Sequence, residues 1–260
     1  MSSRKEQKEE ARAAREAKEQ ELAASAAKKR RLSIVGGVIG LALIAVLIAV
    51  VVSSSTDTKS TSSDAAEVNA RYAGIPQKGI VLGEPNAKAT IVEFADLRCP
   101  YCKDIDEGSM PTIIEELVKT GKANYIFRNL TMLDGASPSG KDSTNAARYA
   151  GAASLQNKMY EFIDLLYLNQ GAENQDWATE QTLMGIGKQI DGLDAQQAWD
   201  NRENPKVTAL LAKADEQATE LNVTGTPTLF VGADEASLKK IGLDDLTDPQ
   251  AIIDAVDALQ

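Results

Sequence analysis

Two patterns of apolar positions after residue 76 predict the order of the secondary-structure elements. Short apolar runs bounded by turn residues indicate strands, and apolar residues spaced three or four apart indicate helices. The predicted strands are an edge strand at Ile80–Leu82 and further strands at Thr90–Ala95, Asn124–Arg128 and Thr228–Val231. The predicted helices run from near position 99 to Lys119 with a kink at Pro111, from Thr144 to Asn169, and over 180–190, 194–201, 206–221 and 249–259. This order, with a helical block between strand pairs, is typical of an α/β domain.

A different pattern precedes this domain. Residues 34–52 form an apolar run without a charged side chain, which at about 1.5 Å per residue can cross a bilayer core of ~30 Å. Two lysines and two arginines at positions 28–31 come directly before it, and serine and threonine follow it. The positive-inside rule therefore predicts a transmembrane helix over 32–52, with residues 1–31 in the cytoplasm and the remainder outside the cytoplasm.

A cleaved signal peptide is the alternative for this segment. Its apolar region is normally ~7–15 residues long and follows a short basic region. Here the apolar run is longer and follows a tail of about thirty residues, so an uncleaved anchor in the cell membrane is favoured. No cysteine lies close after the run, which excludes a lipoprotein anchor.

Composition divides the chain further. The tail, residues 1–31, carries ten basic and six acidic residues, whereas the whole chain has a net charge of −10. The acidic part after the anchor argues against binding to nucleic acid. Residues 53–75 are rich in serine, threonine, aspartate and alanine and are predicted to be a flexible linker. Residues 76–260 are predicted to form one domain, with a helical insertion at about 142–220.

The chain has two cysteines, Cys99 and Cys102, in a Cys-Pro-Tyr-Cys sequence directly after a predicted strand. At the start of a helix the first thiolate is favoured by the helix dipole. With no third cysteine and no histidine, a zinc site has too few good ligands. An iron–sulfur cluster with four cysteine ligands would have to be shared between two chains. A purely structural disulfide across so short a loop would remove little unfolded-state entropy. The pair is therefore predicted to be a redox couple, and neither a metal nor a cofactor is expected.

Four sequence features together resemble the DsbA-like branch of the thioredoxin superfamily, in a membrane-anchored form. They are the strand before the cysteine pair, the proline-bearing helix after it, the strand end at 127–130, and Val-Thr-Gly-Thr-Pro-Thr at 223–228 before the last strand pair. The resemblance covers about residues 76–260. It implies a thioredoxin-like fold with an inserted helical subdomain, and activity as a thiol:disulfide oxidoreductase.

The resemblance assigns roles to individual positions. Pro227 would have a cis peptide bond facing the cysteine pair, and Thr226 would present backbone groups to a substrate segment; an ordinary trans proline is the alternative. Glu93 occupies the place of a buried acid beneath the active site, where a raised pKa would let it relay a proton to or from Cys102. The alternative for Glu93 is a solvent-facing position at a sheet edge.

Pro100 and Tyr101 would tune the reactivity of the cysteine pair. Strongly oxidising members of this branch usually have histidine at the place of Tyr101, and tyrosine cannot supply that positive charge. A Cys99 pKa between ~3.5 and ~7 is expected.

The sequence thus predicts an extracytoplasmic enzyme that forms disulfides in exported cysteine-containing proteins. Cys99 would be the nucleophile and Cys102 the resolving thiol. The resemblance also suggests a quinone-coupled membrane partner that re-oxidises the pair. A reductase or isomerase, and a membrane-tethered chaperone without redox turnover, are the alternatives.

Overall fold

The computed structural model describes residues 61–172, 174–242, 245 and 247–260. The predicted cytoplasmic tail and transmembrane helix, and residues 53–60 of the predicted linker, lie outside the described residues. Within the described ranges, no helix combines the length and apolar character needed to span a bilayer.

The described residues contain a mixed sheet with the strand order β1-β2-β4-β3-β5-β6. Its central strand β3 pairs in parallel with β4 and antiparallel with β5, and the other neighbours are antiparallel. The strands are β1 (Gln77–Lys78), β2 (Val81–Leu82), β3 (Ala89–Ala95), β4 (Ala123–Asn129), β5 (Thr228–Gly232) and β6 (Lys239–Lys240). Every residue of β3, β4 and β5 is buried, as expected for strands covered on both faces.

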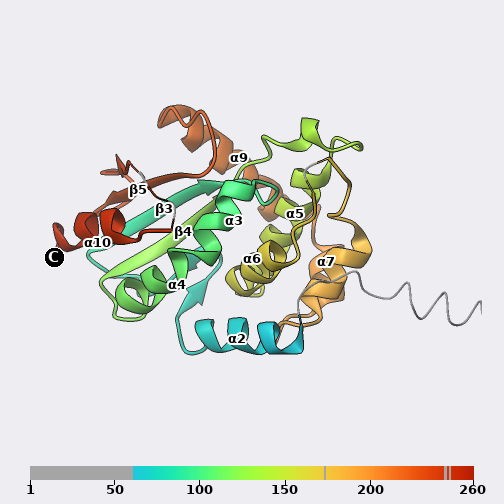
Figure 1. The fold of residues 1–260 in the computed structure, drawn as a ribbon, viewed down its shortest axis with the longest axis horizontal. Coiled ribbons are helices and arrows are strands. Elements are labelled where there is room, and N and C mark those ends of the chain that lie inside the picture. Colours follow the sequence, from blue (N-terminus) through green and yellow to red (C-terminus); the bar gives the residue numbers. More distant parts are fainter. Residues whose placement is uncertain (1–60, 173, 243–244, 246) are drawn as a thin grey trace, which may run out of the picture. The chain divides into compact units, whose positions relative to one another are not determined.

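Helices cover both faces of this sheet. They are α2 (Ser62–Tyr72), α3 (Pro100–Glu107), α4 (Met110–Ile113), the π-helical turn η1 (Ile114–Val118), the 3₁₀ turn η2 (Asp134–Ala136), α5 (Asp142–Ser154), α6 (Met159–Leu168), α7 (Glu180–Gly187), α8 (Ala195–Asp200), α9 (Pro205–Glu220) and α10 (Gln250–Asp257). Helices α5 to α9 are inserted between β4 and β5 (Figure 1). The thioredoxin-like α/β fold with inserted helices is therefore confirmed.

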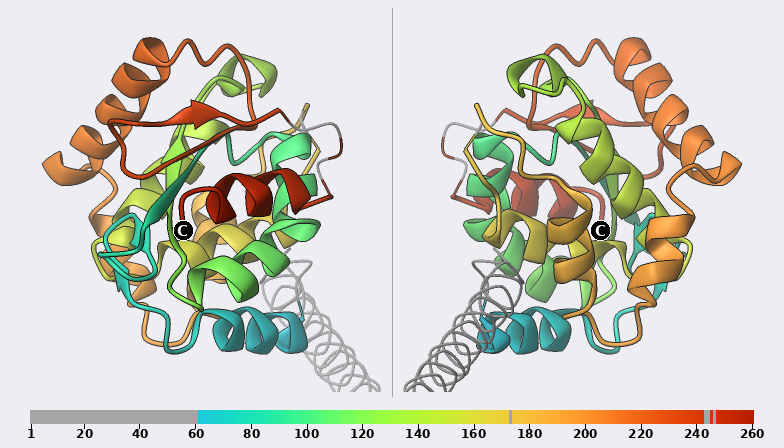
Figure 2. Two further views of the ribbon diagram at one scale, coloured as in Figure 1. Left: turned by 90° about the vertical axis from the view of Figure 1, so that its left-hand side faces the viewer. Right: turned by 90° about the vertical axis from the view of Figure 1, so that its right-hand side faces the viewer.

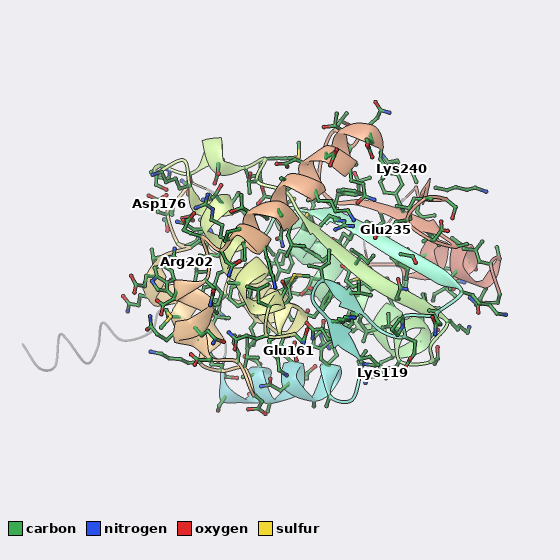
Figure 3. The ribbon with its side chains drawn as sticks, turned by 180° about the vertical axis from the view of Figure 1, so that it is seen from behind. Lys119, Glu161, Asp176, Arg202, Glu235 and Lys240 are labelled. Carbon is green, nitrogen blue, oxygen red and sulfur yellow. The ribbon has the colours of Figure 1, made fainter. Side chains whose placement is uncertain are left out.

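Alternate residues of β3 point to opposite layers. Ile91 faces the larger core, which includes residues of α3, α6 and α10, while Val92 and Phe94 face a smaller core under α9. Figure 2 shows α9 (orange) on one side and α10 (dark red) with α3 and α4 (green) on the other. On the α9 side, the guanidinium of Arg128 pairs with Glu235, which Figure 3 labels beside α9. The period of two in the sequence thus places neighbouring residues of β3 in different cores.

Four predicted element boundaries were wrong. The helix after Cys99 breaks at Gly108–Ser109, and Pro111 lies in the first turn of α4, where its missing N–H leaves no hydrogen bond unmade. Gly108 allows close approach of another segment, because a Cβ there would lie 3.0 Å from the Cα of Thr247. The predicted helix over 144–169 is two helices, separated where Asn157 has a φ of 58°.

The other two corrections concern the N-terminal side of the domain. Strand β2 pairs with both β1 and β4, so the sheet edge is β1 and not residues 80–82. Residues 62–72 were placed in a flexible linker, and this was wrong, because they form helix α2. Thr61 and Asp64 make a capping box at its start, and the apolar side chains Ala65, Val68 and Tyr72 are buried. Helix α2 packs against α6.

Candidate active site

The cysteine pair lies at the start of helix α3, and three residues separate Cys99 from the end of β3. Cys99 is the N-cap residue with extended backbone angles, and Pro100 occupies the first helical position, which its fixed φ favours. Cys102 lies in the first turn and is fully buried, and both cysteines are free thiols. Tyr101 points outward and keeps 61 % of its surface exposed. The first sulfur is therefore nearer the surface than the second.

The loop between β3 and α3 is fixed by hydrogen bonds to its backbone and to the side chain of Asp96. The carboxylate of Asp96 accepts from the N–H groups of Arg98 and Leu133, each at 2.9 Å, and from the hydroxyl of Ser143 at 2.8 Å. The side-chain amide of Gln170 donates to the carbonyl oxygen of Cys99 at 3.2 Å. Because Ser143 and Gln170 belong to the helical insertion, the insertion holds the active-site loop in place.

A buried ion pair joins the same loop to the insertion. The guanidinium of Arg98 lies 3.0 Å from the carboxylate of Asp142, and both side chains are almost fully buried. The same carboxylate accepts from the backbone N–H groups of Trp177 and Ala178, at 2.8 and 3.0 Å. Burial of a charge pair requires such additional hydrogen bonds to offset desolvation.

The surroundings of Cys99 stabilise its thiolate. A hydrogen bond from the Cys102 thiol, together with one from the Cys102 backbone N–H at the helix start, lowers the pKa of Cys99 to about 6 against partial burial. A hydrogen bond from the side chain of Thr226 acts in the same direction. In its neutral form the Cys99 thiol donates to the backbone carbonyl oxygen of Thr226 at 3.4 Å. This pKa falls within the range expected from the sequence. Cys99 is therefore largely a thiolate at neutral pH.

Cys102 has the opposite character. Burial raises its pKa well above the usual value, and the hydrogen bond to Cys99 and the nearby Glu93 carboxyl act in the same direction. Cys102 thus holds its proton when Cys99 has lost its own. A resolving thiol in this state needs a base before it can attack a mixed disulfide.

Glu93 lies in the central strand β3 and is 2 % exposed, so the alternative of a solvent-facing edge position is excluded. Burial raises its pKa to about 7, although a hydrogen bond from the hydroxyl of Tyr125 opposes this rise. Its charge interacts with both Cys99 and Cys102. A carboxyl group with a pKa near 7 can both accept and donate a proton at neutral pH.

The peptide bond between Thr226 and Pro227 is cis, as the resemblance implied. The carbonyl of Thr226 faces the Cys99 sulfur, so this turn and the cysteine pair form one site. The structure therefore brings together Cys99, Cys102, Glu93, Thr226 and the cis proline. Within the described part of the chain, no three histidine, cysteine, aspartate or glutamate side chains cluster so as to hold a metal ion.

Comparisons with known proteins agree with this geometry. A family model named Thioredoxin_4 and described as thioredoxin matches residues 76–254. The chain belongs to this thioredoxin family. It is 30 % identical over 159 residues to a probable disulfide bond formation protein D of Bacillus cereus, covering 60 % of this chain and 71 % of the relative.

Two solved structures are similar to this chain in fold. Oxidised BdbD of Bacillus subtilis superposes with a TM-score of 0.59 at 22 % identity, covering 71 % of this chain and 96 % of that one, which shows the fold. The thiol-disulfide exchange protein alpha-DsbA2 of Wolbachia pipientis has a TM-score of 0.53 at 26 % identity, covering 76 % and 95 %. The chain is a DsbA-like thiol:disulfide oxidoreductase of the thioredoxin family.

Sequence reasoning missed several residues of this thioredoxin-family site. Asp96 and Arg98 hold the active-site loop in place. Their polar side chains lie just before Cys99 in the sequence, and this closeness could have indicated that role. Nothing local indicates Tyr125, Asp142 or Gln170, because their contacts to the site span 32 or more positions along the chain. These partners depend on the register of the sheet and on the docking of the insertion.

Proposed function

We propose that this oxidoreductase is anchored in the cell membrane, faces the extracytoplasmic side, and forms disulfides in exported proteins. The observation that most supports disulfide formation is the contrast between the two cysteines. Cys99 is a thiolate with a pKa of about 6, whereas Cys102 is a buried thiol that keeps its proton. A stabilised Cys99 thiolate favours the reduced enzyme, so the oxidised enzyme readily gives up its disulfide to a substrate. The relative named disulfide bond formation protein D is consistent with this direction.

The reaction transfers one disulfide. A substrate thiolate attacks the sulfur of Cys99, the Cys99–Cys102 bond breaks, and Cys102 leaves as a thiolate that takes a proton from Glu93. The second substrate thiolate then attacks the substrate sulfur of the mixed disulfide, and Cys99 leaves as a thiolate. The substrate loses two electrons and the enzyme gains them. Thr226 and Pro227, adjacent to Cys99, would align the substrate backbone.

Re-oxidation of the dithiol needs an acceptor. A quinone-coupled membrane partner would take the two electrons, and a membrane anchor would keep the pair close to it. The Cys99 pKa of about 6 lies between the ~3.5 of DsbA and the ~7 of thioredoxin. The reduction potential should accordingly lie between the value of DsbA, about −120 mV, and the reducing end of the glutaredoxin range, about −230 mV.

The resting redox state in cells tests the direction. Cells are quenched in acid, free thiols are alkylated with a mass tag, and Cys99 and Cys102 are scored as tagged or untagged. A mostly untagged, oxidised pair is expected. A mostly tagged pair would identify a reductase or isomerase instead. Retention of function by a variant lacking both cysteines would point to a chaperone without redox turnover.

Protease treatment of intact, wall-stripped cells tests the topology. An epitope at residue 260 should be destroyed and an epitope near residue 20 spared. A mature protein that begins near Ser53 and is free in the medium would refute the anchor.

A further inference from the structure

Two buried acidic side chains lie on helices α3 and α6, apart from the cysteine pair and Glu93. Asp106 follows Cys102 by one helical turn on α3 and shares its buried face. Asp164 comes from α6 and is 3 % exposed. The two carboxyl groups line the same cavity and interact directly with one another. Two buried carboxyl groups in contact cannot both be ionised without a large penalty, so they share a proton.

Helix α2 determines which of the two acids holds that proton. The guanidinium of Arg71 lies 2.6 Å from the carboxylate of Asp164, and the hydroxyl of Tyr72 donates to it at 2.7 Å. Burial raises the pKa of both acids, but these two partners oppose the rise at Asp164. The negative charge therefore resides on Asp164 and the proton on Asp106.

Asp106 and Asp164 both line a cavity that reaches the surface. The cavity has a volume of about 390 Å³, and Asp106, Asp164 and Arg71 line it together with the exposed Glu67. Asp106 also interacts electrostatically with Glu93. Cys102 is fully buried, so a proton that it exchanges with Glu93 needs a route to water other than through the substrate side.

We propose that Asp106 and Asp164 form the route by which protons pass between Glu93 and the water of this cavity. The inference rests on the proposed role of Glu93 in disulfide exchange. During resolution of a mixed disulfide, the Cys102 thiol gives its proton to Glu93 as its sulfur attacks. Asp106 then passes its own proton to Asp164 and on to water, and takes up the proton of Glu93. The pair ends with the one proton it began with.

Other ionisable groups surround this route. Those that line the cavity or interact with the two acids come from α2, α3, β3, β4 and α6: Asp64, Glu67, Arg71, Tyr72, Glu107, Glu93, Tyr125 and Tyr167. Arg71 is the one cation in this set, and it contacts Asp164 and not Asp106. Arg71 also lowers the pKa of Asp106 electrostatically, but its direct ion pair is with Asp164, so Asp106 is the acid that keeps the proton.

The test compares full-length wild type with Asp106→Asn. Asparagine has nearly the shape of a protonated aspartate but cannot release a proton, so the fold should persist. The reduced protein, in detergent, is mixed with glutathione disulfide, and resolution of the Cys99–glutathione intermediate is followed by acid quench and mass spectrometry at pH 6–8. Resolution should be about tenfold slower in Asp106→Asn at pH 7. Imidazole, a small proton carrier that can enter the cavity, should restore the rate in proportion to its concentration.

Three comparisons make the result specific. Asp104→Asn, an exposed substitution on the same helix, should behave as wild type with and without imidazole. The reduction potential of Asp106→Asn should stay close to wild type, because a proton carrier changes a rate and not an equilibrium. Asp164→Asn should show the same imidazole-dependent defect and replaces the first variant if Asp106→Asn fails to fold.

The outcomes distinguish a failure of the proton route from a failure of the proposed function. Resolution at the wild-type rate in both variants, or a slow rate that imidazole does not change, would overturn the proton route. A wild-type rate in Glu93→Gln would instead remove the relay on which the route depends. Failure of wild type itself to exchange with glutathione disulfide would refute the oxidoreductase function.

Discussion

The raised pKa of Glu93 has a measurable consequence for stability. The folded protein holds the Glu93 proton with a pKa of about 7, against an ordinary value of 4.5. Because the folded state binds this proton more tightly than the unfolded state, the resulting stabilisation is complete below pH 4.5 and is lost as the pH rises through 7. The difference in pKa corresponds to about 3 kcal/mol between pH 4 and pH 8. Glu93→Gln removes this dependence, since glutamine does not titrate.

Urea unfolding of the oxidised full chain in detergent measures the effect. Oxidation removes the two thiols from the titration, and fluorescence of Trp177 and Trp199, the two tryptophans of the chain, reports on the inserted helices. The free energy of unfolding of wild type minus that of Glu93→Gln should fall by about 3 kcal/mol from pH 4 to pH 8. Titrating groups that do not interact with Glu93, such as Asp96, contribute equally to both proteins and cancel.

The control is Glu84→Gln, an exposed change of the same chemistry just before β3. Its difference from wild type should be independent of pH. If the curves of wild type and Glu93→Gln run parallel from pH 4 to pH 8, Glu93 is ionised at neutral pH. Burial would then not raise its pKa, and the relay argument would lose its physical basis.

Three further predictions follow from the site. Asp142→Ala should lower the free energy of unfolding by about 3–5 kcal/mol in urea, because Arg98 would remain buried and charged; a loss below 1 kcal/mol would contradict this. Tyr125→Phe removes a hydrogen bond that lowers the pKa of Glu93, so the pH profile of mixed-disulfide resolution should move to higher pH; an unchanged profile would exclude that coupling. Tyr101→His should lower the Cys99 pKa below about 6 in thiolate absorbance and make the potential in glutathione buffers more positive; a wild-type potential near −270 mV would support a reductase.

Residue type and spacing along the chain predicted much of the fold and of the active site. Cys99, Cys102 and Pro227 carry their information in residue type and spacing, and no other thiol or imidazole competes for their roles. The apolar runs of the three central strands were read correctly, as were most helical periods, whereas α2 was missed because its composition is that of a linker. Element ends were read less well. The breaks at Gly108 and Asn157 depend on close approach by another segment and on a left-handed backbone, which an apolar period does not record.

Tertiary structure decided what the pattern could not. A glutamate in an apolar strand is consistent with either a buried or a solvent-facing position; pairing of β3 on both sides buries Glu93 and thereby raises its pKa. Helix α2 has the composition of a linker and becomes part of the domain because Ala65, Val68 and Tyr72 are buried where it packs on α6. This packing also brings Arg71 to Asp164. The sequence determined which atoms do the chemistry. The burial and partners that set their proton affinities arise only when distant segments exclude water together.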